Sequence, residues 1–534
     1  MAEMTTVVVV ADPALLKELY GKENEFTKRK MVEMKQTRRM TGDGLATSND
    51  QEPNWGKAHR ILRSAFSPGA MRNYFEVVLS VAALLREHMQ THLAAGTPVD
   101  VSSSVSKLTF ETIGRVCLGH PMNTFGESHP LHEKFEYLTK LQFDMSEGGW
   151  RSQTITIVKL MMSIGKLGDA MQSICRDMMK QRQERCAAAA EGGVGADGCP
   201  TKSMLDYMLV DKDPETGEQM DEANIVNNML TFLVAGHLTT QAVLSNTFYL
   251  IACHPVVEER LYAEIASVCG DGALTWEGLG QMEYLNMVIK ESLRIAGINF
   301  VIKNSPAEPS SIGDYHVPPN TGLLLAIRSV QMNPTIYPDP DAFDPERWSA
   351  ENTAKRPPYC WMPFSHGKRG CIGSQLSMLE MRCALVEIVR RFYLRVDPSS
   401  TVKKQAGDLM TFTGVKLKLH ERGAAPPVPT VGVVAQAPVV KMVDASDEQK
   451  EMVAGKQVLV LYGSNTGTCE DLASRLVARA AALGFTATRA PLDAALADAQ
   501  QGFPAADGVV AVISPSYNGK APDNGVKFDA ALGG

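Results

Sequence analysis

Residues Phe364–Gly373, with the sequence FSHGKRGCIG, constrain this chain more than any other segment. They contain the pattern F-x-x-G-x-R-x-C-x-G, which average residue usage would produce by chance in roughly one chain of this length in ten thousand. The glycines let the backbone turn tightly and pass close to a flat ligand. Cys371 precedes a stretch with helical apolar spacing, Gln375–Arg391, and the positive end of that helix would favour its thiolate. The segment therefore predicts a loop that presents a cysteine thiolate to a metal, although a structural cysteine beside a glycine turn is the alternative.

This segment resembles the haem-ligand loop of the cytochrome P-450 family. The resemblance implies a haem b whose iron takes Cys371 as its axial ligand, with Arg369 as a fixed charge for a propionate. A thiolate ligand promotes O–O cleavage, which suits oxygen activation rather than oxygen carriage. Asn54–His59 resembles the family's helix that gives a tryptophan and a basic residue to the propionates. Trp55 and His59 are four residues apart and can face the same way, although His59 alone would more often be an ordinary surface histidine.

Two further segments fit the same family. Glu291 and Arg294 form an E-x-x-R pair whose charges share one helix face, which is weak support by itself. Asp344–Trp348, with the sequence DPERW, follows at the spacing of the family's P-E-R-F/W segment. The resemblance implies that Arg347 joins Glu291 and Arg294 in a buried ionic network. We expect this network to be scaffold rather than chemistry.

The segment Phe232–Thr240, with the sequence FLVAGHLTT, resembles the family's A-G-x-[D/E]-T-T motif on the long helix over the haem. The resemblance implies that Thr239 bonds dioxygen and steers protons to it. Leu238 replaces the acid that usually precedes this threonine, so proton delivery would need another route through Thr239, His237 or water. The alternative for Thr239 is a hydroxyl that bonds back to its own helix.

From residue 423 the composition becomes proline-rich and then polar, which predicts a linker over 423–455. Lys456–Tyr462 has the pattern of a buried strand, and Gly463–Glu470 (GSNTGTCE) then opens a helix. Hydroxyls and free N–H groups at such a turn can cradle a phosphate, although a Gly/Ser/Thr turn alone is more often an ordinary turn. A second strand, Gly508–Ile513, leads to Ser514–Asn524, whose Tyr517 can stack on a flat ring.

Together the two loops resemble those of a flavodoxin-like FMN domain, in which ligands bind at the carboxyl ends of parallel strands. The resemblance implies FMN contacts from Ser464, Asn465, Thr466, Gly467, Thr468, Tyr517, Asn518, Gly519, Lys520 and Ala521. The order of the parts resembles the self-sufficient fatty-acid hydroxylases of bacteria and fungi, in which a P-450 is fused to a reductase that uses FMN, FAD and NADPH. We expect a haem domain over 1–422, whose opening elements precede Met1, and a partial FMN domain over 456–534 with an uncovered sheet edge.

Composition sets the outer limits of these expectations. The chain has 534 residues, 44% of them hydrophobic and 21% charged, enough for a large domain and a second one. We expect a mainly α cytochrome P-450 fold with small β-sheets, followed by a partial α/β flavodoxin-like domain. The net charge of −7 and dispersed basic residues argue against a nucleic-acid partner. Ten scattered cysteines fit the reduced thiols of a cytoplasmic protein, and no apolar run reaches the ~18 residues of a transmembrane segment.

The leading functional hypothesis is a haem-thiolate monooxygenase of the unspecific type. It would convert R–H, O2, two electrons and two protons to R–OH and water. A long-chain fatty acid as substrate is implied by the resemblance alone, and NADPH–haemoprotein reductase activity is expected only in a full-length form. The first alternative, suggested by Leu238, is a haem-thiolate isomerase, dehydratase or peroxygenase. The attached FMN-like domain argues against it, because such enzymes need no electron supply. The second alternative is a degenerate haem-binding fragment.

Overall fold

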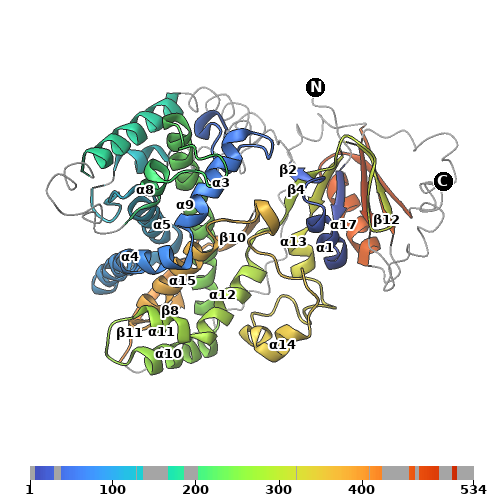
Figure 1. Ribbon diagram of the computed structural model, residues 1–534. Coiled ribbons are helices and arrows are strands. Elements are labelled where there is room, and N and C mark those ends of the chain that lie inside the picture. The colour runs from blue at the N-terminus through green and yellow to red at the C-terminus, as the bar shows by residue number, and fades with distance from the viewer. Residues whose placement is uncertain are drawn as a thin grey trace.

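The computed structural model describes residues 7–28, 38–127, 129–135, 137, 166–185, 202–319, 321–407, 409–423, 456–463, 468–491 and 508–513. In these ranges a large helical body lies beside a smaller region of sheet (Figure 1). Of the predicted linker, 423–455, only Gly423 is among the described residues.

Long amphipathic and apolar helices build the helical body. Its principal helices are α3 (Pro53–Ala65), α4 (Pro68–Ala95), α5 (Val101–Leu118), α9 (Glu222–Cys253), α12 (Glu283–Ile295) and α15 (Ser374–Val389). Ser67, Asp100 and Asp221 cap α4, α5 and α9, and each side chain accepts a hydrogen bond from the N–H three residues later. The body also contains α10 (Pro255–Cys269). Shorter elements are α8 (Met204–Val210), α11 (Trp276–Gln281), α13 (Ile327–Gln331), α14 (Ala350–Ala354) and the 3₁₀ turns η2 (Pro345–Trp348) and η3 (Gly367–Arg369).

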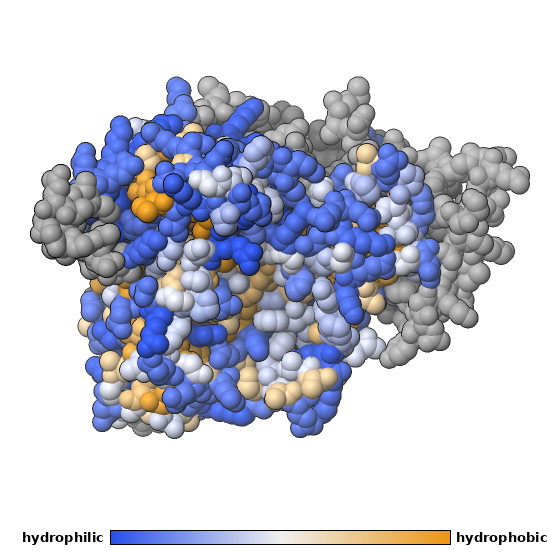
Figure 2. Space-filling view, in the orientation of Figure 1, coloured by the Kyte–Doolittle hydropathy of each residue, from blue (hydrophilic) through white to orange (hydrophobic). Residues whose placement is uncertain are grey.

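Helix α9 runs through the middle of this body. It packs against α5, α12, α15 and the strand β10 (Met410–Thr413), and for this reason most of its surface is apolar. One continuous core of buried side chains extends from α3 through α9 to α15. On the face in Figure 2, hydrophilic residues predominate and apolar ones gather in small groups, one of them recessed near the centre. Within the described ranges, none of the helices combines the length and apolarity that a membrane crossing requires.

Small sheets flank the helices, as predicted. An antiparallel sheet has the order β3 (Val99–Asp100), β11 (Lys416–Glu421) and β8 (Phe392–Val396). Two hairpins pair β5 (Ser310–Ile312) with β6 (Tyr315–Val317), and β9 (Lys403–Ala406) with β10.

A seven-stranded sheet joins the two ends of the chain, in the order β13-β12-β14-β1-β7-β4-β2. Its strands are β1 (Val7–Val10), β2 (Thr27–Lys28), β4 (Val301–Asn304), β7 (Gly322–Leu325), β12 (Gln457–Gly463), β13 (Thr486–Pro491) and β14 (Gly508–Ile513). Strand β1 runs parallel to both β7 and β14, with Val8 opposite Leu323 on one side and Ala511 on the other. The helices α1 (Pro13–Gly21) and α17 (Thr468–Ala482) lie in this part of the molecule (Figure 1).

This sheet corrects one expectation. The flavodoxin-like strands were expected to leave an edge uncovered, but the Val510–Ile513 part of β14 pairs with β1. The physical reason is that the apolar strand Val7–Val10 offers a full row of backbone donors and acceptors to the free edge of β14. On the other side, β13 is the outermost strand of the described sheet and pairs with β12 alone, so that edge fits the expectation.

Candidate haem-thiolate site

The cysteine loop, Phe364–Gly373, is closed by its own backbone. The Cys371 N–H donates to the carbonyl of Phe364 at 2.9 Å, and the Gly370 N–H donates to that of Gly367 at 2.9 Å. Gly367 has a φ of 72°, and a Cβ there would overlap the carboxylate of Glu23. Only glycine therefore fits this turn.

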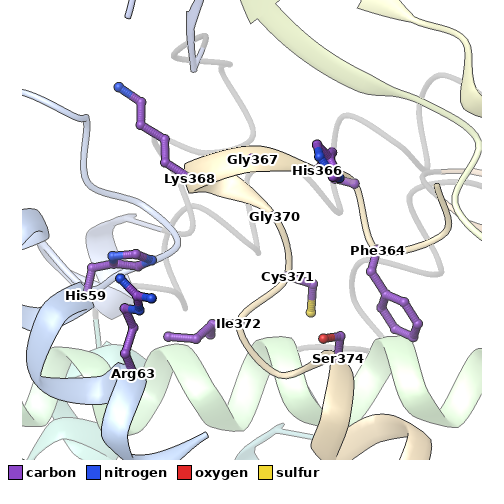
Figure 3. Close-up of a pocket in the computed structure, with 11 residues that line it drawn as sticks. His59, Arg63, Phe364, His366, Gly367, Lys368, Gly370, Cys371, Ile372 and Ser374 are labelled. Atoms are coloured by element: carbon purple, nitrogen blue, oxygen red, sulfur yellow. The ribbon is translucent and has the colours of Figure 1, made fainter. Parts of the chain in front are cut away.

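A cavity of about 540 Å³ opens beside Cys371 (Figure 3). The cysteine loop and two side chains of α3, His59 and Arg63, line it. Burial raises the pKa of the Cys371 thiol, and a hydrogen bond from the Gly373 backbone opposes this. The Cys371 residue is nonetheless exposed and lines the cavity, so a metal could reach its sulfur. A bound metal would remove that proton, because a coordinating thiol is deprotonated.

The three residues predicted to hold a propionate meet at one place. The rings of Trp55 and His59 stack with their centres 5.1 Å apart, and the Arg369 guanidinium lies 4.3 Å from the centre of the Trp55 ring. Burial lowers the pKa of His59, and the charges of Arg63 and Arg369 lower it further. His59 would therefore be neutral near pH 7 and would act as a hydrogen-bonding group rather than as a cation.

Arg369 is also held by the loop that precedes α3. Its Nε donates to Asp50 Oδ1 at 2.5 Å, and the other Asp50 oxygen lies 3.2 Å from Lys368 Nζ. Burial alone would raise the pKa of Asp50, but Arg369 and Lys368 outweigh this effect and hold that pKa below its usual range. Asp50 is therefore ionised near neutral pH.

On α9 the structure shows the alternative that the sequence left open for Thr239. Its hydroxyl donates to the Ala235 carbonyl at 2.8 Å. Ala235 and Thr239 are both exposed, one turn apart, in a helix that is otherwise mostly buried. Leu238 is partly buried and packs against the core. The Thr240 hydroxyl donates to Ser377 at 3.1 Å, which fixes α9 against α15.

His237 is not brought together with Thr239. It is buried and faces α5, where one ring nitrogen lies 2.7 Å from Thr109 Oγ1 and the other 3.4 Å from Ser106 Oγ. The Phe110 ring packs edge-on against it, with centres 5.3 Å apart. Residues two apart on an α-helix are about 200° apart around its axis, and this separation turns His237 away from the face of Thr239. These contacts of His237 with α5 give no support to its predicted part in proton delivery.

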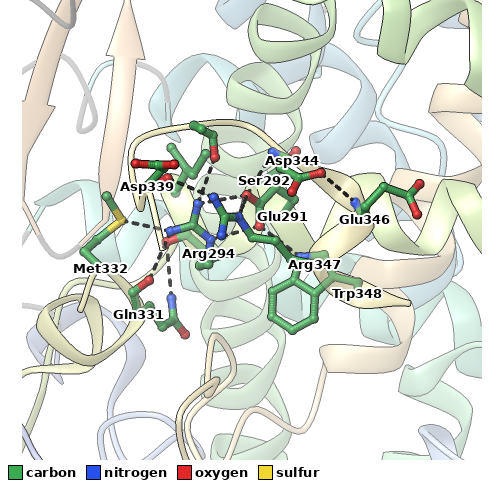
Figure 4. A network of polar contacts seen from close by, with 12 residues as sticks. Glu291, Ser292, Arg294, Gln331, Met332, Asp339, Asp344, Glu346, Arg347 and Trp348 are labelled. Carbon is green, nitrogen blue, oxygen red and sulfur yellow. Dashed lines mark hydrogen bonds and ion pairs between the residues drawn. The ribbon is translucent and has the colours of Figure 1, made fainter. Parts of the chain in front are cut away.

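The predicted ionic network is present in the geometry (Figure 4). Arg294 donates to both oxygens of Glu291, at 2.8 and 2.9 Å, and both side chains are fully buried. Arg347 Nε lies 3.2 Å from Glu291 Oε1, and the Trp348 indole donates to Oε2 at 2.9 Å. Both oxygens of the buried Glu291 carboxylate therefore accept hydrogen bonds from charged or indole N–H groups.

This network reaches the cysteine loop through Gln331. The Gln331 carbonyl accepts a hydrogen bond from Arg294 at 3.1 Å, and its side-chain oxygen accepts one from the Met362 N–H at 3.0 Å. Met362 stands two residues before Phe364, where the loop begins. The network therefore positions the loop without contacting the cavity.

All but one of the predicted FMN contacts lie outside the described residues. These are Ser464, Asn465, Thr466, Gly467, Tyr517, Asn518, Gly519, Lys520 and Ala521. Thr468 is the first residue of α17. Strand β12 ends at Gly463 and β14 at Ile513, so the two predicted loops follow neighbouring parallel strands at the same sheet edge.

Sequence reasoning missed Arg63 and Asp50. Arg63 follows His59 by four residues, so the helical spacing of α3 would have pointed to it. Asp50 and Arg369 are 319 residues apart, and no local pattern connects them.

The residues fit a haem. The sulfur of Cys371 opens on the cavity, His59 lines it as well, and Trp55 and Arg369 pack in turn behind His59. This set matches a metal that brings its own equatorial ligands and two carboxylates.

Comparison with protein-family models decides the family. Residues 1–419 match the model for cytochrome P-450, and residues 460–534 match the model for flavodoxin. The chain belongs to the cytochrome P-450 family. This confirms the predicted fold class, a mainly helical P-450 fold followed by a flavodoxin-like domain.

Similar curated proteins combine both parts. The chain is 29% identical over 546 residues to the self-sufficient cytochrome P-450 monooxygenase CYP505E4 of Penicillium freii, covering 98% of this chain and 49% of that protein. It is 29% identical over 526 residues to the bifunctional cytochrome P-450/NADPH–P-450 reductase 2 of Bacillus subtilis (strain 168), covering 95% and 46%. The chain thus spans about half the length of these relatives.

Solved structures agree with the fold of the helical body. The cytochrome P450DA heme domain superposes with a TM-score of 0.68 at 29% identity, covering 78% of this chain and 87% of that one. A second P-450, CYP102L1, gives a TM-score of 0.67 at 26% identity, covering 78% and 89%.

Proposed function

We propose that this chain carries the haem-thiolate part of a monooxygenase that inserts one atom of O2 into a C–H bond of a long-chain fatty acid. The observation that carries the proposal is Cys371, open to a cavity beside the stacked residues Trp55 and His59 and next to Arg369. The named relatives support the reaction class, since they are a monooxygenase and a P-450/reductase fusion. The fatty-acid substrate rests on the family resemblance.

In this proposal each residue has a defined task. Cys371 would supply the axial thiolate, and Trp55, His59 and Arg369 would hold a propionate. When bound, haem supplies dioxygen binding and O–O cleavage, which a thiolate ligand promotes. Thr239 would release its bond to Ala235, and its freed hydroxyl would hold a proton for the reaction.

Electrons would come from NADPH through FAD and FMN. The flavodoxin-like domain supports this part of the proposal, because it is the kind of domain that carries FMN next to an acceptor. Reductase activity is proposed for a protein that also includes the FAD and NADPH modules. A cytoplasmic location belongs to the same proposal and is supported by the free thiols among the described cysteines.

Isotope labelling tests the reaction. The haem-loaded chain, supplied with a separate NADPH–P-450 reductase and a long-chain fatty acid, should form a hydroxylated product that takes one oxygen atom from ¹⁸O2. Thr239→Ala should divert electrons to peroxide. Thr247→Ala is the matched control, because Thr247 makes the same kind of hydroxyl-to-carbonyl bond on α9, to Val243 at 2.8 Å, within the buried core. Product without label from ¹⁸O2 would contradict the proposal.

A second candidate is a peroxygenase or isomerase that needs no reductase. Leu238 favours it, because this side chain packs against the core where an acid would serve proton delivery, and His237 faces α5 instead. Leu238→Glu separates the candidates. In a monooxygenase it should raise the product formed per NADPH, since a proton-transfer group contributes about 10²–10⁴-fold to its step. A wild type that forms product from peroxide without NADPH, and that does not respond to Thr239→Ala, would favour the second candidate.

A further inference from the structure

The loop of residues 42–52, here called the anchor loop, lies directly against α9. Asp43 Oδ1 accepts hydrogen bonds from Asn224 at 3.1 Å and from Asn227 at 2.8 Å. A Cβ on Gly44 would lie 2.7 Å from the Asn227 carbonyl, so the two backbones approach as closely as glycine allows. The position of the anchor loop is therefore fixed by a buried helix.

The other side of the anchor loop holds Arg369. Its Nη1 donates to the Leu45 carbonyl at 3.0 Å, its Nη2 donates to the Ser48 carbonyl, and its Nε donates to Asp50 at 2.5 Å. The Trp55 ring covers the guanidinium at 4.3 Å. Each nitrogen of Arg369 is thus engaged by the chain itself, which sets the direction of the guanidinium independently of a haem.

The Asp50 carboxylate pairs with cations that a haem propionate would also use, so the two carboxylates compete for them. The Asp50 side chain is 6% exposed and touches both Arg369 and Lys368. His59 would be neutral near pH 7, because burial and the neighbouring charges lower its pKa. The positive charges nearby are those of Arg369, Lys368, Arg63 and Lys303. Asp50 therefore offsets part of this positive charge, and Glu23 adds a further carboxylate, 2.9 Å from the Lys368 N–H and 4.0 Å from Lys303 Nζ.

We propose that Asp50 is a positioning residue for the haem, which orients Arg369 and also balances part of the charge that would otherwise bind the propionate. The inference rests on the proposed function, because it requires that the cavity beside Cys371 binds haem. A carboxylate here weakens the attraction for a second one. It also lowers the reduction potential of a nearby haem, because a negative charge favours the ferric state over the ferrous state.

The charge effect and the bracing effect of Asp50 can be separated by two variants. Asp50→Asn removes the charge but keeps an acceptor for Arg369 Nε, whereas Asp50→Ala removes both. The charge control is Glu218→Gln, which also removes one negative charge beside α3, where Glu218 pairs with Lys57 at 3.0 Å and does not touch Arg369.

The experiment uses the haem-loaded full chain. Haem loss is followed by transfer to apomyoglobin, and the ferric/ferrous midpoint potential is measured by spectroelectrochemistry. We expect Asp50→Asn to lose haem more slowly than the wild type, on the order of fivefold, and to have a higher potential. Asp50→Ala should share the higher potential but lose haem faster than Asp50→Asn, and Glu218→Gln should change neither value.

The inference is overturned if Asp50→Asn loses haem as fast as the wild type or faster, or if its potential does not rise. A wild type that does not take up haem would instead overturn the proposed function, so the two failures are distinguishable. Circular dichroism melting of the variants checks that each is folded when these values are taken.

Discussion

The helical body and the flavodoxin-like strands surround their predicted cofactor sites with very different amounts of protein. Around the cysteine loop, one core of buried side chains continues from α3 through α9 to α15. Next to β12, the separate cluster of buried residues that the structure describes consists of Val460, Tyr462 and Ala473. Among the described residues, the first site is thus bordered by a large core and the second by a small cluster.

The two regions also differ in what holds their loops. The cysteine loop is closed by its own backbone and is connected through Gln331 to the buried pair Glu291–Arg294. The strand β14, by contrast, obtains one of its two neighbours from β1, at the other end of the chain. The comparison teaches that local hydrogen bonds and a large core can hold a loop in position before a cofactor binds. The position of a loop at a strand end is instead set by the strands that pair with that strand.

Replacing the proposed iron ligand should have the largest effect. Cys371→Ser should abolish the strongly red-shifted Soret band of the reduced carbonyl complex, because an alcohol does not replace a thiolate as the axial ligand. The absorption spectrum after reduction under carbon monoxide measures this directly. Cys383→Ser is the control, since Cys383 is a buried thiol on α15 outside the cavity lining. A Cys371→Ser protein that keeps the band would show that another residue binds the iron.

Flavin content tests the other half of the comparison. The purified chain of 534 residues should hold haem near one per chain but far less than one FMN, because among the described residues the buried cluster beside β12 is much smaller than the core around the cysteine loop. Fluorescence of the flavin released after desalting gives the ratio. Tightly bound FMN at one per chain would show that the small core suffices.

The cysteine loop and the ionic network were the parts most open to prediction. Their spacings are local, since Glu291 and Arg294 are one helical turn apart and the glycines of the loop stand next to Cys371. The same reasoning could not assign His237, because a motif that contains adjacent residues does not say which of them faces the cavity. The rotation of α9 decides that, and packing against α5 sets the rotation.

Contacts between distant segments that no family motif connects could not be predicted. Asp50 meets Arg369 only because α9 holds the anchor loop beside the cysteine loop. The pairing of β1 with β14 is equally invisible in the sequence. Four consecutive valines carry no side-chain pattern that would specify a partner or a register.

Breaking the ionic network should destabilise the helical body next most strongly. Glu291→Gln leaves the buried charges of Arg294 and Arg347 without their carboxylate, which typically costs about 3–5 kcal/mol. Denaturant unfolding followed by circular dichroism should show this loss, together with lower haem content. Glu351→Gln removes an exposed pair with Lys355 and should cost no more than about 1 kcal/mol. Equal losses in the two variants would show that the network does not support the site.

The smallest expected effect is a pH dependence that only the deep core can produce. Glu380 on α15 is 3% exposed, and burial raises its pKa to about 8, although the nearby Thr112 hydroxyl opposes the shift. Because the folded pKa lies above the ordinary value of 4.5, the folded state prefers the protonated acid. The contribution of the Glu380 carboxyl to the stability of the folded state is therefore complete below pH 4.5 and is lost as the pH rises toward 8.

Glu380→Gln should therefore gain stability relative to the wild type between about pH 5 and pH 8, by on the order of 2 kcal/mol, since the amide stays neutral throughout. Unfolding free energies at several pH values in this window measure the difference. The control is Glu277→Gln, at an exposed pair with Arg72, whose stability should run parallel to that of the wild type. If the Glu380→Gln curve also runs parallel, the carboxyl is not held protonated, and the core around α15 admits more water than its burial indicates.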